Sequence, residues 1–242
     1  MLLTMRKVET ESRRQLSAAL DLVRDSQETG LVLRIAGSLA VLLYCHRQDR
    51  PSPPGDIDLV GCAKQRAGVQ RFLAGRGWAL SGGLLLVSEI RDLFVNANVG
   101  MSLDVYYGAI DGSHPIIINE AHLRSAFPAI PIGDLLLSKL QRRRMRDVDV
   151  WDCCAVLGLP ESSPDDEMVV RAVSRDWGLY RTVMENLNAL TASCSLAEER
   201  IARMRIACEG SRKSVRWVLR ALIGSRVRWW REVYDPAGRA VR

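Results

Sequence analysis

The stretch that decides the fold runs from Leu31 to Val60 and reads LVLRIAGSLAVLLYCHRQDRPSPPGDIDLV. It predicts, in order, a buried strand over residues 31–35, a tight turn at Gly37 and Ser38, an apolar helix over 39–46, a Pro-rich loop, and a second strand with Asp56 and Asp58. Free backbone N–H groups at a helix N-terminus can hold a phosphate. Gly37 lets the backbone approach such a group, and Ser38 offers a hydroxyl and an N–H. The turn is therefore a candidate phosphate-binding site.

Two carboxylates follow on the second predicted strand. Because side chains alternate across a strand, Asp56 and Asp58 share one face while Ile57 and Leu59 point into the core. Two carboxylates a few Å apart repel each other and are tolerated mainly when a divalent cation neutralises them. The pair therefore indicates a metal site. The alternative is that both aspartates belong to a loop and that the Gly-Ser turn is ordinary, since a bare D-x-D motif is common by chance.

A third carboxylate, Asp104, lies in a predicted strand over residues 102–107 that pairs antiparallel with 93–95. The alternation places Leu103 and Val105 in the core and Asp104 on the opposite face. Aspartate is unfavourable in a strand interior, so its presence needs a reason. Completing a carboxylate cluster is one reason. A charge that protects an edge strand from aggregation is the other.

The Gly-Ser turn that opens a helix, the D-x-D strand and the later strand aspartate together resemble the nucleotidyltransferase superfamily. Among its branches the chain looks most like the AbiEii-type nucleotidyltransferases, some of which are toxins of toxin–antitoxin pairs. The resemblance covers roughly residues 31–157. It implies that Asp56, Asp58 and Asp104 are the catalytic and metal-binding residues, with Mg²⁺ or Mn²⁺ as cofactor, and that Gly37 and Ser38 bind the nucleotide.

The leucine-rich helix predicted over residues 134–141, DLLLSKLQ, resembles the D-L-L-x-x-K-L helix of that branch. The resemblance implies that Lys139 faces the nucleotide. A lysine that extends its amine to water from a half-buried helix is the alternative. Arg142, in the cluster at 142–146, is a second candidate for offsetting triphosphate charge. Asp149 and Asp152 follow as a D-x-x-D pair that either orients these basic side chains or simply forms salt bridges with the arginines.

The loop before the D-x-D motif departs from the family pattern. The family usually places a Ser or Thr, following an Arg, two residues before the motif. Here Ser52 lies four residues before Asp56, and the segment Pro53-Pro54-Gly55 intervenes. We expect this loop to hold the nucleotide differently or the enzyme to be weak.

The composition is that of an ordinary globular protein, with 242 residues, 48% of them hydrophobic and 26% charged. The apolar run at 39–44 is too short to span a bilayer, and the N-terminus becomes charged too early for a signal peptide. The six cysteines show no metal-ligand spacing, and the adjacent pair Cys153-Cys154 is a poor disulfide framework. We therefore expect reduced thiols in a cytoplasmic protein without membrane contact.

The predicted fold class is α/β, with a nucleotidyltransferase-like mixed twisted sheet and flanking helices in a catalytic domain over 1–119, and a helical C-terminal domain over 120–242. Further predicted elements are helices over 4–27, 63–74, 165–173, 175–191, 196–222 and 225–234, a hairpin of 78–80 with 84–87, and a strand over 116–118.

Positive charge is concentrated at the C-terminal end. Residues 200–242 hold twelve Lys and Arg against three Asp and Glu, which suggests a polyanionic partner such as RNA. Trp217, Trp229 and Trp230 are interleaved with basic residues, as in proteins that stack bases beside phosphate contacts. The basic residues expected on one side of a helix are Arg203, Arg212, Lys213, Arg216 and Arg220. A helix with tryptophans in the core and arginines in water is the alternative.

The function predicted from these features is metal-dependent transfer of NMP from an NTP to an acceptor hydroxyl. RNA or tRNA is a candidate acceptor, and a toxin role would bring a cognate antitoxin as partner. A small-molecule nucleotidyltransferase of the aminoglycoside type is one alternative. It needs an acidic pocket for a polycation, and the basic cluster at 142–146 argues against it. A non-catalytic RNA-binding protein on the same scaffold is the other alternative.

Overall fold

The computed structural model describes residues 2–47, 49–81, 90–98, 100–160 and 163–232. The chain divides into two compact units, Met1–Asp111 with Ile117–Pro131 and Gly112–Ile116 with Ile132–Arg242. We refer to them as the first unit and the second unit and describe each by itself. The predicted domain boundary between residues 119 and 120 stays a prediction.

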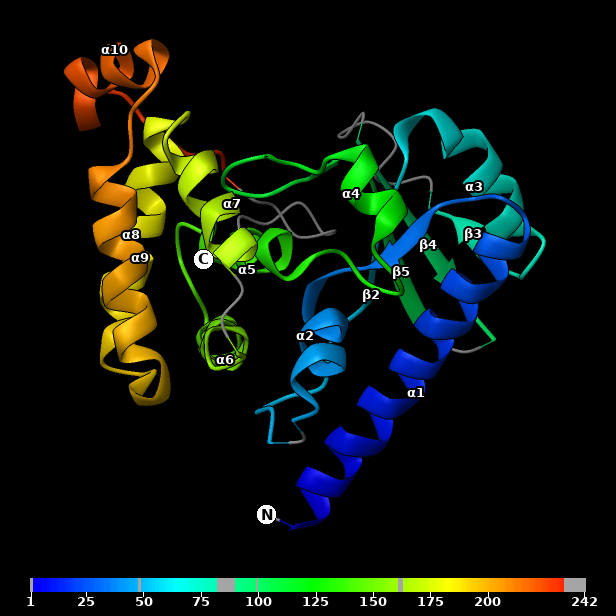
Figure 1. The fold of residues 1–242 in the computed structure, drawn as a ribbon. Helices are drawn as coiled ribbons and strands as arrows, with labels where there is room; N and C mark the ends of the chain where they lie inside the picture. Colours follow the sequence, from blue (N-terminus) through cyan, green and yellow to red (C-terminus); the bar gives the residue numbers. More distant parts are fainter. Residues whose placement is uncertain (1, 48, 82–89, 99, 161–162, 233–242) are drawn as a thin grey trace. The chain divides into compact units, whose positions relative to one another are not determined.

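A five-stranded sheet organises the first unit (Figure 1). Its strands are β1 (Leu33–Ile35), β2 (Ile57–Gly61), β3 (Ala79–Leu80), β4 (Arg91–Asn96) and β5 (Met101–Tyr107), in the order β1-β2-β5-β4-β3. Strands β2 and β5 are parallel, and the other neighbours are antiparallel. The predicted mixed sheet of an α/β fold is therefore confirmed.

The pairing of β4 with β5 confirms the predicted antiparallel pair around the turn at 96–100. The predicted strand at 31–35 begins two residues later than expected, at Leu33. The strand expected at 116–118 is present as β7 (Ile116–Ile117), which forms a two-stranded sheet with β6 (Ala109–Ile110). The second strand of the hairpin expected at 84–87 lies outside the described residues.

Among its described residues, the first unit has four α-helices beside the sheet: α1 (Leu2–Glu28), α2 (Gly37–Cys45), α3 (Arg66–Ala74) and α4 (Glu120–Ser125). Helix α1 packs on β1 and α2, and it buries Ala19, Leu22 and Val23 at helical spacing. This is the amphipathic helix that the sequence predicts ahead of the first strand.

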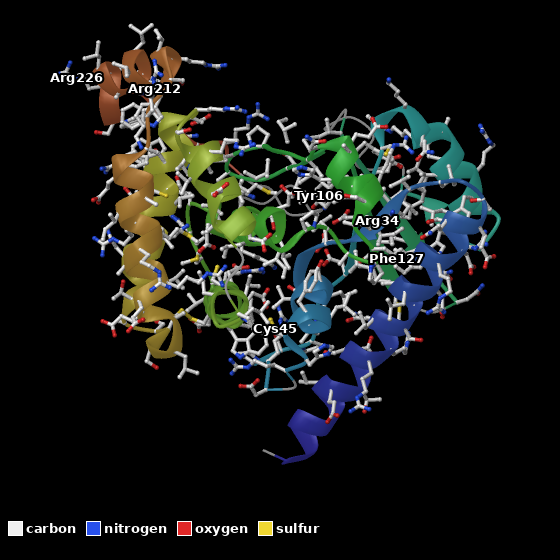
Figure 2. The ribbon with its side chains drawn as sticks, in the orientation of Figure 1. Arg34, Cys45, Tyr106, Phe127, Arg212 and Arg226 are labelled. Atoms are coloured by element: carbon white, nitrogen blue, oxygen red, sulfur yellow. A yellow bond between two sulfur atoms is a disulfide. The ribbon has the colours of Figure 1, made fainter. Side chains whose placement is uncertain are left out.

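Arg34 is a buried charge within β1, and it ties this strand to the end of α4 and to the residues that follow it. Its guanidinium donates to the carbonyls of Leu33 at 2.7 Å and Arg124 at 3.3 Å. The same group lies 5.6 Å from the ring centroid of Phe127. Figure 2 labels both residues. Backbone carbonyls and an aromatic face thus accommodate a cation that burial would otherwise destabilise.

The second unit is helical, as predicted. Its helices are α5 (Ile132–Leu140), α6 (Asp147–Leu157), α7 (Ser163–Val173), α8 (Trp177–Thr191), α9 (Glu198–Gly210) and α10 (Val215–Ile223). Helix α5 contacts α6, α7 and α8, and every residue from 133 to 140 is buried. A helix that is buried all round belongs to the interior of its unit, which explains the leucine-rich run.

The single helix expected over 196–222 is wrong. The chain turns out of α9 after Gly210, and Ser214 begins α10 by accepting a hydrogen bond from the Trp217 backbone N–H at 3.2 Å. A serine at this position competes for backbone N–H groups and so starts a new helix. The helix expected near 225–234 is reduced, among the described residues, to one 3₁₀ turn at Gly224–Arg226.

The expectation that all six cysteines are reduced is also wrong. Cys154 and Cys194 form a disulfide between α6 and the segment before α9, with a Cα–Cα distance of 5.2 Å. They lie 40 residues apart, and cysteine spacing alone cannot reveal such a pairing. Cys153, the adjacent residue, is a buried free thiol. The cytoplasmic location inferred from reduced cysteines stays a prediction without that support.

Within the described residues, no helix is both long enough and apolar enough to cross a membrane.

Candidate functional site: an acidic cluster at the Gly-Ser turn

The structure brings the three predicted carboxylates together. Asp58 of β2 and Asp104 of β5 are register partners in the parallel pair, and Asp56 lies just before β2. One ligand oxygen from each residue lies within 4.8 Å of the other two. We call Asp56, Asp58 and Asp104 the acidic cluster. Strand register is its cause, because neighbouring strands place partnered side chains on one face.

The opposite face of β2 and β5 carries the core. Ile57, Leu59, Leu103 and Val105 have no exposed surface, in agreement with the predicted alternation. Asp104 is itself 1% exposed, so it occupies an interior position of the sheet, not an edge. The interpretation of Asp104 as a charge that protects an edge strand therefore loses its basis.

The Gly-Ser turn lies directly against the acidic cluster. Gly37 has a φ of +60°, and a Cβ added there would be 1.9 Å from Oδ2 of Asp58. Only glycine permits both this backbone conformation and this close approach. The Asp58 carboxylate therefore lies beside the first residue of α2, whose N-terminal N–H groups favour negative charge.

This geometry constrains the predicted phosphate site. A phosphate at the N-terminus of α2 would lie close to the Asp58 carboxylate, and the two anions would repel each other. A cation held by the acidic cluster would remove the conflict. The phosphate-binding and metal-binding interpretations of Gly37 and Asp58 are thus physically linked.

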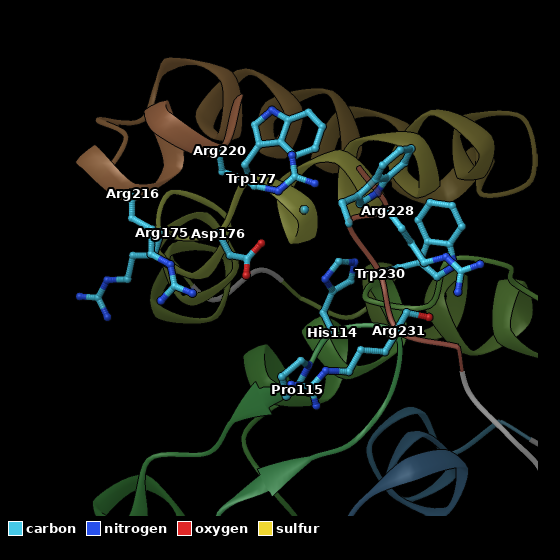
Figure 3. A pocket seen from close by; sticks show the side chains of 13 residues that line it. His114, Pro115, Arg175, Asp176, Trp177, Arg216, Arg220, Arg228, Trp230 and Arg231 are labelled. Carbon is cyan, nitrogen blue, oxygen red and sulfur yellow. The ribbon is translucent and has the colours of Figure 1, made fainter. Parts of the chain in front are cut away.

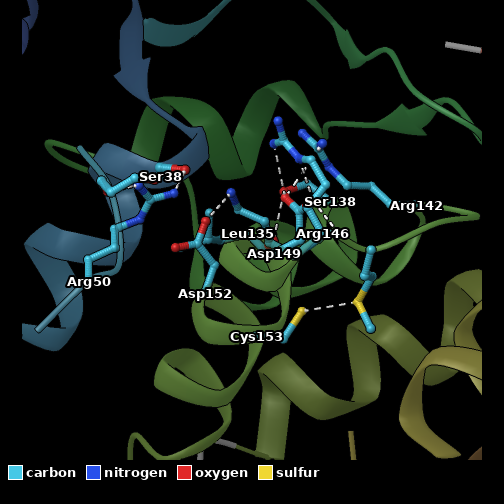
Figure 4. Close-up of polar contacts among 12 residues, drawn as sticks. Ser38, Arg50, Leu135, Ser138, Arg142, Arg146, Asp149, Asp152 and Cys153 are labelled. Carbon is cyan, nitrogen blue, oxygen red and sulfur yellow. Dashed lines mark hydrogen bonds and ion pairs between the residues drawn. The ribbon is translucent and has the colours of Figure 1, made fainter. Parts of the chain in front are cut away.

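Arg50, which the sequence did not single out, lies next to the turn. It is 7% exposed and donates a hydrogen bond to the Ser38 hydroxyl at 2.9 Å (Figure 4). It also donates to the carbonyl of Ser52. A buried arginine thus connects the Gly-Ser turn to the loop that departs from the family pattern. The Arg-Pro-Ser sequence at 50–52 is a weak signal that could not have revealed this contact.

Arg91 is a second contact that the sequence did not reveal. Its guanidinium donates to both carboxylate oxygens of Asp104, at 3.0 and 2.6 Å. Arg91 is the register partner of Tyr106, two residues along β5 from Asp104. The register of β4 on β5 therefore places Arg91 on the face of the acidic cluster. The antiparallel pair predicted from the sequence did not specify which residues of β4 and β5 lie opposite each other.

The environment raises the pKa of two groups at the cluster. Burial raises the pKa of the Asp104 carboxyl, Arg91 opposes the shift, and Asp56 adds to it. Burial and the Asp58 carboxylate raise the pKa of the Tyr106 phenol well above its usual value. Asp104 therefore binds a proton more readily than an ordinary aspartate, and Tyr106 stays neutral.

Lys139 lies in the second unit and is almost completely buried. Its Nζ is 2.8 Å from Oδ2 of Asp152, which has no exposed side-chain surface. It is not a lysine that reaches from a half-buried helix into water. Its predicted contact with a nucleotide stays a prediction.

Arg142, the other predicted nucleotide-binding residue of the second unit, lies 3.5 Å from Oδ1 of Asp149. Arg146 lies 3.0 Å from Oδ2 of the same aspartate (Figure 4). Of the two interpretations of the D-x-x-D pair, the salt bridges with the basic cluster are therefore present. The nucleotide-binding role of Arg142 stays a prediction.

The basic residues near the C-terminus do not follow one helix face, because α9 and α10 are separate. Lys213 lies in the connection between them, with its Nζ 4.7 Å from the Tyr180 ring centroid and 5.4 Å from that of Trp217. Apolar side chains make up much of the exposed surface of α10: Val215, Val218, Leu219, Leu222 and Ile223. The geometry proposed for RNA binding along one helix is therefore wrong, and RNA itself stays a prediction as partner.

No protein-family model and no curated protein matches the chain. Among solved structures, it is similar to the solution structure of the antibiotic-resistance factor ANT(2'')-Ia, with 12% identity over 82% of this chain and 92% of that one and a TM-score of 0.42. For ANT(2'')-Ia in complex with adenylyl-2''-tobramycin the values are 14%, 81%, 94% and 0.38. For an antigenic nucleotidyltransferase-like protein from Paracoccidioides brasiliensis they are 11%, 84%, 96% and 0.45. Likenesses this weak do not test the AbiEii-type resemblance, which stays a prediction.

Proposed function

We propose that the protein transfers a nucleotidyl group from an NTP to an acceptor hydroxyl, with the acidic cluster as its catalytic centre. The observation that carries the proposal is the convergence of three carboxylates from two parallel strands, within 4.8 Å, directly against a helix N-terminus. Like charges gathered this closely favour a bound cation, and a helix N-terminus favours a phosphate.

The donor atoms suit Mg²⁺ or Mn²⁺. All three ligands are carboxylate oxygens, which these hard cations prefer. Asp56, Asp58 and Asp104 would hold the ion. A divalent ion bound there would offset the charge of the triphosphate and favour loss of the acceptor proton.

The chain's own residues have distinct parts in the proposed reaction. The acceptor oxygen forms a bond to the α-phosphorus, the bond from that phosphorus to the β-phosphate oxygen breaks, and pyrophosphate leaves. Asp104 would help to remove the proton of the acceptor hydroxyl, because the ion that it holds would bring the two together. Gly37 and Ser38 would bind phosphate oxygens through backbone N–H groups. Arg50, held against the Ser38 hydroxyl, would add positive charge there.

The acceptor class is inferred from the family resemblance, not from the acidic cluster. An RNA or tRNA hydroxyl, with a toxin role and a cognate antitoxin, is the acceptor class that we propose from the AbiEii-type resemblance. A small polycationic acceptor of the aminoglycoside kind is the alternative to test beside it. The salt bridges of Arg142 and Arg146 with Asp149 reduce the basic character that argued against a polycation.

The test is transfer of label from each NTP, labelled at the α-phosphate, in the presence of Mg²⁺ and one acceptor at a time: total RNA, tRNA or tobramycin. We expect one acceptor to become labelled and Asp58→Asn to lower the rate by at least about 100-fold, because Asn keeps the shape and removes the charge. The Tm of the variant should not fall.

Asp25→Asn is the matched control. It makes the same chemical change in the first unit at a partly exposed residue that pairs with Arg76, and it should keep the wild-type rate. Label transfer that survives in Asp58→Asn, or that does not depend on a divalent ion, would contradict the proposal.

A further inference from the structure

A cavity of about 410 Å³ lies within the second unit (Figure 3). Its walls come from the segment 113–115, the start of α8, the helix α10 and the segment 228–231. None of its lining residues belongs to the acidic cluster or to the Gly-Ser turn. A volume of this size is typical of small-ligand sites.

The cavity is strongly basic. Among the residues that the structure describes, one aspartate lines it, Asp176, and its carboxylate accepts a hydrogen bond from the Leu179 backbone N–H at 2.9 Å as the N-cap of α8. The lining arginines are Arg175, Arg216, Arg220, Arg228 and Arg231. Their positive charge in a concave surface attracts anions.

Two of these arginines are fixed by the protein itself. Arg220 donates to the carbonyls of Gly224 and Val227 at 2.7 and 2.8 Å and lies 4.8 Å from the ring centroid of Trp177. Arg228 lies 3.0 Å from a carboxylate oxygen of Glu232. Both therefore form part of the wall.

The other three arginines are free to bind a ligand. In the part of the chain that the structure describes, no carboxylate pairs with Arg175, Arg216 or Arg231. They come from three different segments and line the same cavity, as Figure 3 shows. Guanidinium groups of this kind match the oxygens of a phosphate with paired N–H donors.

The floor of the cavity offers hydrogen bonds without adding charge. His114 is buried with its Nε2 2.9 Å from the Thr182 hydroxyl, and burial lowers its pKa to about 4. Its imidazole is therefore neutral at neutral pH. Trp229 also lines the cavity, and its indole N–H is buried without an acceptor among the described residues. An oxygen of a bound anion would satisfy that donor.

We propose that this cavity is a second anion site that binds the phosphate groups of a nucleotide, separate from the acidic cluster. Arg175, Arg216 and Arg231 contact the phosphate oxygens, and the tryptophans form the wall that holds the site. The phosphate groups belong either to a free nucleotide or to the 5′ end of an RNA strand, since both present the same chemistry to the arginines.

The experiment measures tryptophan fluorescence of the full chain while ADP or a 5′-phosphorylated RNA trinucleotide is added in EDTA. Removing divalent ions suppresses metal-dependent nucleotide binding at the acidic cluster, so failure of one site does not imply failure of the other. We expect saturable binding that weakens as salt rises. The triple variant Arg175→Gln, Arg216→Gln, Arg231→Gln should weaken it by at least about 100-fold, because it removes several charge-assisted hydrogen bonds.

The matched control loses the same charge elsewhere in the second unit. It is the triple variant Arg144→Gln, Arg171→Gln, Arg181→Gln, at exposed positions that do not line the cavity. It should bind as the wild type does. Tighter binding of ADP supports a free nucleotide as ligand, and tighter binding of the trinucleotide supports an RNA end. Equal loss in both triple variants, or no binding of either probe, overturns the proposal. The single variant Arg216→Gln serves if the first triple variant does not fold.

Discussion

Aspartates gather in both units, and they do so in opposite ways. In the first unit the three carboxylates of the acidic cluster converge on one point, within 4.8 Å. In the second unit Asp149 and Asp152 are on one helix, and each engages different cations. Asp149 pairs with two arginines, and Asp152 pairs with a buried lysine.

The difference separates an arrangement that serves the fold from the one on which the proposed function depends. Carboxylates that each meet a cation neutralise charge inside a fold and require nothing further. Carboxylates that face one another raise the free energy of the site, and in the acidic cluster Arg91 offsets part of that charge at Asp104 alone. The same residue type therefore forms closed ion pairs in one unit and, in the other, a cluster that suits the proposed metal site.

The largest effect should come from the glycine that makes room for Asp58. Gly37→Ala would place a Cβ 1.9 Å from Oδ2 of that carboxylate, in a backbone conformation with φ of +60°. We expect transfer to fall by at least about 100-fold, because the acidic cluster can no longer converge. Label transfer per folded molecule, with the folded fraction taken from thermal unfolding, is the measurement.

Gly100→Ala separates the two causes. Gly100 has nearly the same φ, +62°, and a Cβ there would have no heavy atom within 4 Å. Gly100→Ala should lower the free energy of unfolding by about 1–2 kcal/mol, the cost of a Cβ in the left-handed backbone conformation, and should leave transfer unchanged. Equal losses of transfer in the two variants would mean that Asp58 does not depend on the glycine. A larger loss of transfer in Gly37→Ala would show that Gly37 makes room for the Asp58 carboxylate, in addition to letting the backbone approach a phosphate.

The paired arrangement of the second unit predicts a loss of stability. Lys139→Met leaves the buried Asp152 carboxylate without its lysine and should lower the free energy of unfolding by about 3–5 kcal/mol. Adding Asp152→Leu should recover most of that loss, because two apolar groups then pack together. Chemical denaturation of both variants measures the effect.

Kinetics of the double variant also test the predicted nucleotide contact. If Lys139 faces the nucleotide, the KM for NTP stays raised after stability recovers. A wild-type KM in the stable double variant would make the lysine purely structural. The Lys139–Asp152 ion pair of the second unit would then serve the fold alone.

Much of this contrast could be predicted from sequence, because it depends on local periodicity. Alternation along residues 56–59 and 102–107 was enough to place the acidic cluster on one face, and the Gly-Ser turn marked the start of α2. Leucine density predicted the helix α5, but not that it is buried on every side.

Contacts that join distant segments could not be predicted in this way. The Arg91–Asp104 pair depends on the register of β4 on β5, and the disulfide depends on how helices pack. The cavity arginines come from separate segments, with Arg175 lying 41 residues before Arg216 and Arg231 lying 15 residues after it, so no motif unites them. The break between α9 and α10 was missed, although Gly210 ends the first helix and Ser214 caps the start of the second.

The smallest effect concerns Arg91, which partly offsets the charge of the acidic cluster. Arg91→Gln removes the guanidinium from both oxygens of Asp104. Mg²⁺ then no longer competes with a guanidinium for the Asp104 carboxylate. Added Mg²⁺ should therefore raise the Tm of the variant by a few degrees more than that of the wild type. Because Arg91 lowers the pKa of Asp104, its loss raises that pKa further. Protons then compete with the ion up to a higher pH. As the pH is lowered, the rise in Tm caused by Mg²⁺ should therefore disappear at a higher pH in the variant than in the wild type.

Arg66→Gln provides the comparison that decides this point. Arg66 donates to both oxygens of the buried Asp92 on β4, at 3.2 and 2.6 Å, in the same sheet but outside the acidic cluster. Its removal should lower stability by a similar mechanism, yet Mg²⁺ should add nothing beyond its wild-type effect. Breaking the Arg66–Asp92 pair frees a carboxylate outside the acidic cluster, whereas breaking the Arg91–Asp104 pair frees a carboxylate of the proposed metal site. If both variants gained equally from Mg²⁺, the gain would come from general screening of charge, and the distinction between converging and paired carboxylates would fail at the site where it matters most.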